Sequence, residues 1–400
     1  MARKNQTERR TDSFSDHQII RDDCIQRMGG WPANCVDLVF ADPPFNIGYR
    51  YDGYDDAKRY EDYVNWSRDW MAACVRVLKP TGSFYIAIGD AYAAELRLIG
   101  RELGLTLRNW IIWHYSFGQN MRSRFALAHT HILYFTRDPK RFTFNDVPVR
   151  YPSARHTEYS DRRAHPLGRV PDDVWNEYPR VCGTFKERQG WHGCQMPEAL
   201  LVRIIRAASN PGDVVLDPFV GSGTTTSAAA RLGRIAVGID QSEEYAAEAE
   251  RRLRDVMSLA EASRTENANE WTDWERDCLR QLYRETDTPR ESLVANRVAM
   301  TCFKECLAER IDGTHSVAKI TVELERLDKN AELPRFKNDR PFRARVRRGA
   351  EHAPDRKLKE SWYVGLPNTV KAGNERAVAQ LSTSAAEGAA GNGRRRKRRA

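Results

Sequence analysis

The strongest constraint on the fold of this chain is an alternation of two sequence patterns between residues 17 and 257. Short runs rich in β-branched and aromatic residues alternate with amphipathic stretches of helical period, as in a parallel sheet covered by helices on both faces. We therefore expect an α/β fold. The expected strands are residues 17–21, 36–41, 83–88, 108–114, 131–136, 213–217 and 235–240, and the expected helices are residues 60–78, 91–103, 198–208, 224–232 and 243–257.

One pair of neighbouring strands departs from the parallel pattern. No helical stretch is evident between strands 108–114 and 131–136, so these two are expected to pair antiparallel. The expected sheet is therefore seven-stranded and mostly parallel, with one antiparallel strand.

Changes in composition divide the chain further. Residues 137–190 are rich in Pro, Arg, His and Tyr and have few apolar runs, so we expect an irregular insert between two halves of one domain. Residues 374–400 are too poor in apolar residues to order themselves. The expected divisions are a flexible N-terminus (1–16), a first half (17–136), the insert (137–190), a second half (191–262), a helical and basic appendix (263–373) and a disordered basic tail (374–400). Helices are expected in the appendix at 273–284, 294–310 and 316–327.

The positive charge of the chain is concentrated near its C-terminus. The formal net charge is +9, and residues 394–399 contribute six of the positive charges. Residues 335–348 contribute a further net six, so the rest of the chain is slightly acidic. A local charge of this kind indicates an acidic partner.

Apolar patterning and cysteine usage argue against several classes of protein. No apolar run reaches the roughly 18 residues of a membrane helix, and residues 1–16 have no apolar signal core. We therefore expect a cytoplasmic protein. The eight cysteines are scattered, which indicates reduced thiols. Cys182, His192 and Cys194 come closest to a metal site, but a structural zinc ion usually has four ligands, so no metal is expected.

The first unusual strand end is at Asp42, Pro43, Pro44 and Phe45, which follow strand 36–41 directly. The two prolines fix the backbone and remove two amide donors, which leaves the carbonyls of Asp42 and Pro43 as rigid acceptors. Acceptors beside an aromatic ring suit a planar group that carries an amino function, because the acceptors bind the NH₂ and the ring stacks on Phe45. The alternative is a proline-terminated strand with a surface aspartate.

The second unusual strand end follows strand 213–217, where Gly221 and Gly223 form a turn before a helix that starts at Thr224. The glycines allow a ligand to approach the backbone, and the helix offers amides to a carboxylate or phosphate. The turn lacks the Lys of a nucleoside-triphosphate site and the third Gly of the dinucleotide fingerprint. Asp240 ends the next strand, where an acid hydrogen-bonds ribose hydroxyls. The predicted ligand is a nucleoside without a triphosphate.

These segments together resemble the amino-directed DNA methyltransferases. Residues 42–45 resemble the catalytic motif of that family, and residues 217–225 resemble its S-adenosylmethionine motif. Residues 192–201 are similar to its cofactor-side segment, and residues 20–24 to its acidic strand end near the adenine. The catalytic motif precedes the cofactor motif, which is the circularly permuted order of the β-group. Two positions depart from the family pattern: Met196 stands where Lys is common, and Asp22 where Gly is frequent.

The resemblance implies a fold, a cofactor and a reaction. It implies the S-adenosylmethionine-dependent methyltransferase fold, and direct transfer of the methyl group to the N6 amine of an adenine flipped out of duplex DNA. Asp42 and the Pro43 carbonyl would accept hydrogen bonds from the amine, and Phe45 would stack on the base. No metal or covalent enzyme intermediate is implied.

The cofactor residues follow from the same resemblance. Gly221 and Gly223 would allow close backbone approach, Asp217 would lie near the methionine amino group, and Asp240 would bind the ribose. Asp23 is assigned to the adenine end, with capping of the next turn as its alternative. The remaining candidates are Phe219, which would wall the adenine pocket, Thr224, and the supporting residues Gln195 and Pro197.

Duplex DNA is the implied partner. Three regions are expected to contact it: residues 101–141, the insert, which would read the sequence, and the appendix with its tail. The candidate residues are Arg122, Arg124, Arg155, Arg162, Arg163 and Arg169, and for each of them a solvated surface position is the alternative. A homodimer and a cognate restriction endonuclease are further candidate partners.

Two other functions stay open on the sequence. An N4-cytosine methyltransferase would need the same amine geometry, but Asp42 favours adenine because the cytosine enzymes tend to have Ser at this position. A DNA-binding protein with a lapsed catalytic site is the alternative from another class, and the intact motifs at 42–45 and 221–225 argue against it.

Overall fold

The computed structural model describes most of residues 14–334. The residues not described are 1–13, 53, 116–120, 154, 156–158, 160, 162, 166, 184, 186, 264–270, 287, 312–313 and 335–400, together with the side chains of 259–263. The chain separates into two units, Met1–Phe336 and Lys337–Ala400, and all that follows concerns the first. Arg162, the basic stretch 335–348 and the tail 374–400 lie outside the described residues.

The centre of the fold is an eight-stranded sheet with the order β1-β8-β7-β2-β3-β5-β4-β6. Only β5 runs antiparallel to its neighbours β3 and β4, and the other described pairs are parallel. The α/β class and the single antiparallel strand are therefore confirmed. The strands are β1 (Gln18–Arg21), β2 (Val36–Ala41), β3 (Leu78–Ile88), β4 (Thr106–His114), β5 (His129–Thr136), β6 (Val174–Trp175), β7 (Val214–Asp217) and β8 (Ile235–Asp240).

The eighth strand corrects the prediction of seven. β6 comes from the insert and pairs with β4 through Ile112 and Val174. Because it is only two residues long, it leaves no alternating pattern in the sequence. The insert thus contributes to the sheet edge, while the division of the chain into domains stays a prediction.

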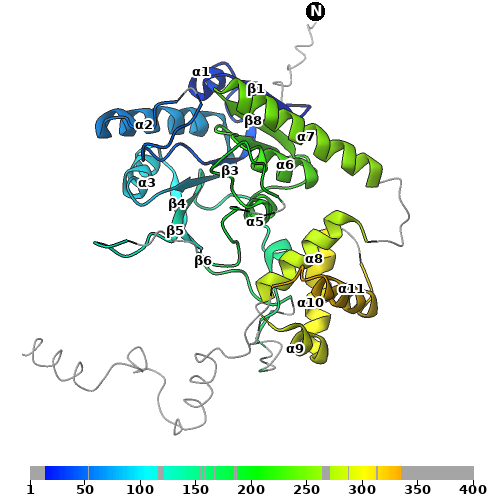
Figure 1. The fold of residues 1–400 in the computed structure, drawn as a ribbon. Coiled ribbons are helices and arrows are strands. Elements are labelled where there is room, and N and C mark those ends of the chain that lie inside the picture. Colours follow the sequence, from blue (N-terminus) through cyan, green and yellow to red (C-terminus); the bar gives the residue numbers. More distant parts are fainter. Residues whose placement is uncertain are drawn as a thin grey trace, which may run out of the picture. The chain divides into compact units, whose positions relative to one another are not determined.

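Helices cover both faces of the sheet (Figure 1). Alternate residues of β2 explain this arrangement, because Val39 packs in one core with α1, α2 and α3, while Leu38 and Phe40 pack in a second core with α5, α6 and α7. The helices are α1 (Cys24–Gly29), α2 (Tyr60–Val77), α3 (Ala93–Glu102), α5 (Glu198–Ala208), α6 (Thr224–Arg231) and α7 (Glu243–Ser263), and a 3₁₀ turn, η1, covers Val147–Val149.

The appendix forms a third core that includes Tyr151 of the insert. Its helices are α8 (Asp273–Thr286), α9 (Arg290–Ala295), α10 (Arg297–Ile311) and α11 (Val317–Lys329). The single helix expected at 294–310 is wrong, because Asn296 is extended and separates α9 from α10. The Asn296 side chain then accepts a hydrogen bond from the Ala299 amide at 3.0 Å, which caps α10.

Three features of the described residues bear on the excluded classes. No helix among residues 14–334, apart from the gaps, is long and apolar enough to cross a bilayer. All eight cysteines are free. In the same part of the chain, no three His, Cys, Asp or Glu side chains come together in a way that could hold a metal ion.

Candidate active site

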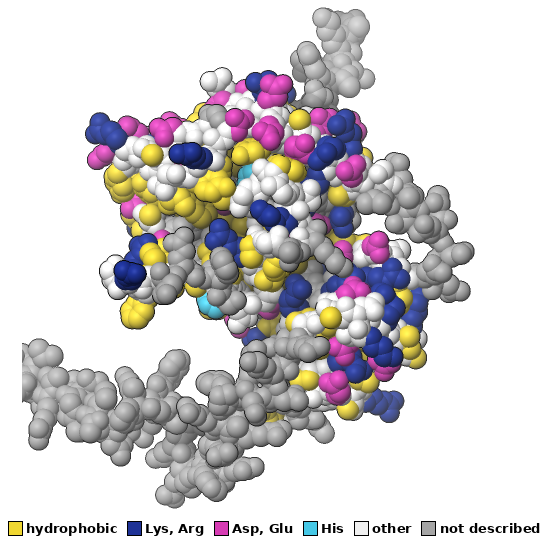
Figure 2. Space-filling model, in the orientation of Figure 1, with side chains coloured by type: hydrophobic (Ala, Val, Ile, Leu, Met, Phe, Trp, Pro, Cys, Tyr) yellow, Lys and Arg dark blue, Asp and Glu magenta, His cyan; other side chains and the backbone are white. Residues whose placement is uncertain are grey.

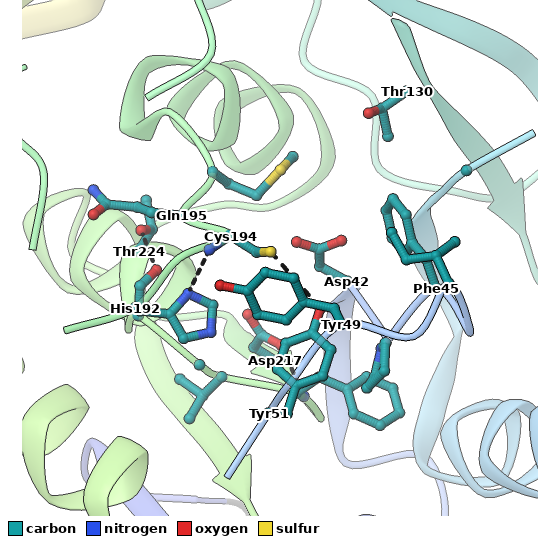
Figure 3. Close-up of a pocket in the computed structure, with 18 of the residues that line it drawn as sticks. Asp42, Phe45, Tyr49, Tyr51, Thr130, His192, Cys194, Gln195, Asp217 and Thr224 are labelled. Carbon is teal, nitrogen blue, oxygen red and sulfur yellow. Dashed lines mark hydrogen bonds between the residues drawn. The ribbon is translucent and has the colours of Figure 1, made fainter. Parts of the chain in front are cut away.

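A cavity of about 740 Å³ lies at the carboxyl ends of the central strands. Its wall contains Asp42 after β2, Asp217 at the end of β7, and Asp240 at the end of β8. Parallel strands end at the same edge of a sheet, so residues far apart in the sequence meet there. The two motifs that the sequence singled out therefore face one cavity (Figure 3).

The cavity wall is acidic. It contains six aspartates, Asp22, Asp42, Asp52, Asp90, Asp217 and Asp240, against two arginines, Arg124 and Arg180. Burial and the nearby charge of Asp217 raise the pKa of Asp42 to about 8. Burial raises the pKa of Asp217 to about 7, although its carboxylate accepts a hydrogen bond from the Phe219 amide at 3.0 Å. Burial and mutual repulsion destabilise the ionised forms of these carboxyl groups. A cationic ligand stabilises the ionised forms, so the cavity favours such a ligand.

Asp42 is half-buried, and its carboxylate has no hydrogen bond or ion pair with any residue that the structure describes. The rest of the motif is held firmly. Pro43 is buried outside the cavity wall, and the Pro44 carbonyl accepts a hydrogen bond from the Tyr63 hydroxyl at 2.6 Å. Phe45 lines the cavity against Gly89, where a Cβ would lie 3.2 Å from the ring.

The described residues of 46–58, which follow the motif at 42–45, form a loop that no sequence pattern predicted. The buried Asp56 carboxylate accepts the amides of Asn46 at 2.7 Å, Ile47 at 3.1 Å and Tyr49 at 2.9 Å. Asn46 has a left-handed φ of 56°, and its side chain binds the Tyr92 hydroxyl at 2.7 Å and the main chain of Lys58. The signal that the sequence did offer was an Asn directly after the motif at 42–45, because Asn is a residue type that tolerates the left-handed conformation.

The same loop joins the two halves of the site. Tyr51 donates a hydrogen bond to the Cys194 sulfur at 3.8 Å, and Ser242 donates to Asp52 at 2.6 Å. Gly193 leaves room for Tyr49, because a Cβ there would collide with the Tyr49 hydroxyl. Tyr49 and Tyr51 both line the cavity, near Asp42, Asp217 and the segment that carries His192 and Cys194 (Figure 3).

The glycine turn is shaped by its protein neighbours. Gly221 lines the cavity at φ +42°, donates its amide to Asp240 at 2.9 Å, and would carry a Cβ only 2.8 Å from His192. Gly223, at φ +71°, lies outside the wall and would place a Cβ 3.1 Å from Ala249 of α7. This glycine therefore makes room for α7, and close approach of a ligand at Gly223 stays a prediction.

A buried arginine of α7 stabilises the glycine turn through hydrogen bonds. Arg252 of α7 donates to the Ser222 carbonyl and to the Thr224 hydroxyl, each at 2.9 Å, and pairs with Glu198 at 3.3 Å. Ser222 and Thr224 both line the cavity. The sequence offered no signal for Arg252, because its partners are at least 28 residues away.

At the expected adenine end, Asp22 and not Asp23 lines the cavity. Asp23 caps α1 by accepting from the Gln26 amide at 2.9 Å, and it binds Gln241 at 2.6 Å, so its capping interpretation is the one the structure supports. Phe219 lines the cavity and packs on Trp66 and Trp70, with ring centroids 5.7 and 5.2 Å away. This pair of contacts fixes an aromatic surface there.

Some residues of the segment before α5 line the cavity, and others do not. Gln195 lines the cavity, but its amide group is engaged by the Gln189 amide at 2.8 Å and the Glu187 carbonyl at 2.7 Å. Met196 also lines the cavity, whereas Pro197 is the N-cap of α5 and lies outside the wall. A role for Pro197 in binding the cofactor therefore stays a prediction.

The candidate DNA-binding arginines fall into two groups. Arg155 and Arg163 pair with Asp161 at 2.7 and 3.0 Å, and Arg169 pairs with Asp172 at 3.1 Å. Arg122 and Arg124 are exposed and form no ion pair with a described residue, and Arg124 also lines the cavity. Among the candidate arginines that the structure describes, Arg124 alone lines the cavity.

Comparison with known proteins agrees with the geometry. Residues 36–251 match a family model for N6 and N4 enzymes described as DNA methylase. The chain is 38% identical to the Type II methyltransferase M.HpaI of Haemophilus parainfluenzae over 239 residues, which are 60% of this chain and 74% of that one. It is 39% identical to the DNA adenine methyltransferase YhdJ of Escherichia coli K12 over 248 residues, 60% of this chain and 83% of that one.

A solved structure is also similar. It is a protein of Thermus thermophilus, described as a DNA modification methylase and complexed with S-adenosyl-L-methionine. The identity is 27%, the match covers 60% of this chain and 94% of that one, and the TM-score is 0.45.

Proposed function

This chain belongs to the family of N6 and N4 amino-directed DNA methylases, and we propose that it methylates the N6 amine of adenine in duplex DNA. DNA amino-methylation with S-adenosylmethionine is the activity of the family, and the fold is that of S-adenosylmethionine-dependent methyltransferases. The choice of adenine, the duplex substrate and base flipping are the proposal. Its central observation is the half-buried Asp42 carboxylate, which is unpaired among the described residues and lies beside Phe45 in the cavity wall.

The residues present fit S-adenosylmethionine. Its sulfonium and ammonium groups are positive, and the acidic wall around Asp42 and Asp217 would hold both. Asp240 and Asp22 offer acceptors for ribose and adenine atoms, and Phe219 offers an aromatic surface. Ser222 and Thr224 at the start of α6 would receive the carboxylate.

The chemistry assigned to Asp42 is that of a positioned acceptor. The amine of adenine is a weak nucleophile because its lone pair is delocalised into the ring. Hydrogen bonds from this amine to the Asp42 carboxylate localise the lone pair on nitrogen, and Asp42 can later take up the proton that the amine loses. S-adenosylmethionine supplies an electrophilic methyl group bound to sulfur, so no covalent bond to the enzyme is needed.

Adenine is preferred over cytosine on two grounds. The carboxylate of Asp42 stands first in the catalytic motif, where the cytosine enzymes tend to have Ser. The relative with 39% identity from Escherichia coli is a DNA adenine methyltransferase. N4-cytosine methylation remains the second candidate, because its amine would meet the same acceptors.

The proposal extends to location and partners. A cytoplasmic location follows from a DNA substrate in a bacterial type of enzyme, and M.HpaI is a Type II methyltransferase, which suggests a cognate restriction endonuclease. A homodimer is a further proposal, with the solution mass as its test.

The test is sequencing of modified bases in DNA from cells that express the protein. We expect N6-methyladenine at one short motif, and no modification in cells that express an Asp42→Ala variant. N4-methylcytosine at a motif would replace the proposal by its alternative. Unmodified DNA from cells with folded, S-adenosylmethionine-binding protein would overturn it, in favour of the lapsed DNA-binding function.

A further inference from the structure

The segment between β4 and β5 extends from the sheet as a finger, of which residues 121–128 are described in full (Figure 1). Its base is rigid, because the antiparallel ladder continues to His114 and His129 and the Tyr115 amide then donates to the Ala128 carbonyl at 2.9 Å. Trp113, at the end of β4, is 3% exposed and lines the cavity. The finger is therefore anchored directly to the cavity wall.

The described part of the finger, residues 121–128, borders the cavity and carries an exposed aromatic side chain. Met121, Arg124 and Leu127 line the cavity. Phe125 is 97% exposed, which is the highest value among the large hydrophobic side chains that the structure describes. Figure 2 shows basic and hydrophobic side chains close together on this finger. The ring of a fully exposed Phe buries almost no apolar area in folding. Leu127 on the same finger is exposed as well, so the finger presents an apolar surface suited to a partner.

The charges of the finger point to the kind of partner. Residues 121–127 contain two arginines and no acid. Arg122 and Arg124 form no hydrogen bond or ion pair with the described residues, unlike Arg155, Arg163 and Arg169 of the insert, which pair with aspartates. Arg122 and Arg124 precede Phe125 by three residues and by one. Unpaired guanidinium groups next to an exposed aromatic ring fit a phosphate backbone and its stacked bases.

We propose that Phe125 enters the base stack of duplex DNA and fills the space that the flipped target base leaves, while Arg122 and Arg124 bind the flanking phosphates. This inference rests on the proposed function, because only a flipped base leaves such a space. An apolar side chain that stacks between neighbouring bases replaces part of the lost stacking, which lowers the cost of keeping the target base extrahelical.

Phe125 and Phe45 then have separate tasks. Phe45 is half-buried in the cavity wall against Gly89, where it can stack only on a base that has left the duplex. Phe125 is exposed beside wall residues Arg124 and Leu127, so it meets the duplex itself. Phe45 would stack on the flipped base in the cavity, and Phe125 would fill the space that this base leaves in the duplex.

The experiment uses the full-length protein and duplexes that contain the motif found by sequencing. One duplex has the target adenine in a normal A·T pair, and the other has the same adenine opposite an abasic site, which removes its pairing partner. We expect Phe125→Ala to lower kcat/KM on the paired duplex by roughly tenfold to a hundredfold and to recover most of the activity on the abasic duplex. Phe125→Trp should retain activity on both, because it can still stack.

The matched control is Val322→Ala on α11, which removes another exposed apolar side chain, 66% exposed, and should leave both duplexes unaffected. Equal activity of wild type and Phe125→Ala on the paired duplex, or an equal loss on both duplexes, would overturn insertion. A smaller solution mass of the variant with unchanged flipping, measured by 2-aminopurine fluorescence, would also overturn it and make the finger a contact between copies. A wild-type enzyme inactive on both duplexes would instead overturn the proposed function.

Discussion

Asp42 and Asp217 line the same cavity, and the charge of Asp217 adds to burial in raising the pKa of Asp42 to about 8. Burial raises the pKa of Asp217 itself to about 7. Both acids come from the carboxyl ends of neighbouring parallel strands, β2 and β7. Near neutral pH the cofactor-free cavity therefore holds protons that a cationic ligand would displace.

Binding of S-adenosylmethionine is expected to release protons and to strengthen as the pH rises from 6 to 8. The positive ligand favours the ionised forms of Asp42 and Asp217, whose pKa values lie near 8 and 7 without it. Linkage gives about a tenfold change in affinity per pH unit for each proton released. Calorimetry in buffers of different ionisation enthalpy measures the protons directly. S-adenosylhomocysteine, which has no charge on sulfur, should show a shallower slope, and a flat profile for both ligands would contradict the prediction.

An Asp42→Asn variant is expected to be more stable than the wild type without cofactor and nearly inactive. The folded protein keeps the Asp42 proton up to about pH 8, whereas the unfolded chain releases it near pH 4. The free energy of unfolding of the wild type therefore falls as the pH rises through this window, and Asn removes that loss, on the order of 1–3 kcal/mol at pH 7. Methyl transfer should fall by roughly 10²-fold or more. Urea unfolding at pH 5 and pH 7 checks the sign, since the two proteins should differ less at pH 5.

The meeting of Asp42, Asp217 and Asp240 could be predicted because each ends or follows a strand, and the carboxyl ends of parallel strands share one edge. The short strand β6 and the break at Asn296 could not, since neither leaves a periodic pattern. The glycine turn shows a subtler limit. The two glycines of the turn were evident in the sequence. The contact of Gly223 with Ala249 was not, because it depends on tertiary packing.

Tertiary structure also explains why Asp22 lines the cavity where the sequence had pointed to Asp23. The two acids are adjacent after β1, and only the start of α1 decides which of them caps a helix and which faces the cavity. Asp56 escaped notice because no motif marks a carboxylate whose partners are backbone amides seven to ten residues earlier. Such supporting residues are visible only once the loop has a conformation.

Asp56→Ala is expected to loosen loop 46–58 and to impair methylation. The change leaves the amides of Asn46, Ile47 and Tyr49 without their acceptor, which should cost about 1–3 kcal/mol of stability. Asp42 should remain in place, so the loss should appear mainly in kcat, through misplaced Tyr49 and Tyr51. Asp55→Ala is the matched control, because the exposed Asp55 carboxylate accepts, among the described residues, only the Ala57 amide, at 3.1 Å. A similar loss in both variants would refute the role given to Asp56.

Glu285 is expected to be essential for attachment of the appendix. It accepts from Tyr178 of the insert at 3.0 Å and pairs with Arg310 at 2.5 Å and Arg203 at 3.2 Å. Burial opposes its ionisation, but the two arginines outweigh it and lower its pKa to about 2. The stability that it contributes is thus present above about pH 4.5 and is lost only as the pH falls toward 2.

Removing this carboxylate leaves the buried Arg310 guanidinium without its carboxylate partner, whereas Arg203 keeps its pair with Glu177 at 3.0 Å. Because a buried charge is left uncompensated, Glu285→Ala should cost about 3–5 kcal/mol. Because the Tyr178 carbonyl also accepts a hydrogen bond from the indole of Trp113 in the cavity wall, at 2.7 Å, methylation should fall as well. Glu291→Ala removes an exposed partner of Arg290 and should change stability by less than about 1 kcal/mol. Thermal unfolding of the three proteins decides, and equal midpoints would contradict the prediction.

Deletion of residues 374–400, which lie outside the described residues, is expected to weaken DNA binding without altering the methylated motif. Residues 394–399 carry six positive charges, and each phosphate contact adds about 0.9 to the dependence of log K on log salt concentration. The deletion should therefore reduce affinity most at low salt and make the salt dependence shallower, as anisotropy titrations from about 50 to 300 mM salt would measure. A variant with Ala at 394–399 keeps the length of the tail and should behave like the deletion. A changed motif in modified-base sequencing would show instead that the tail reads bases.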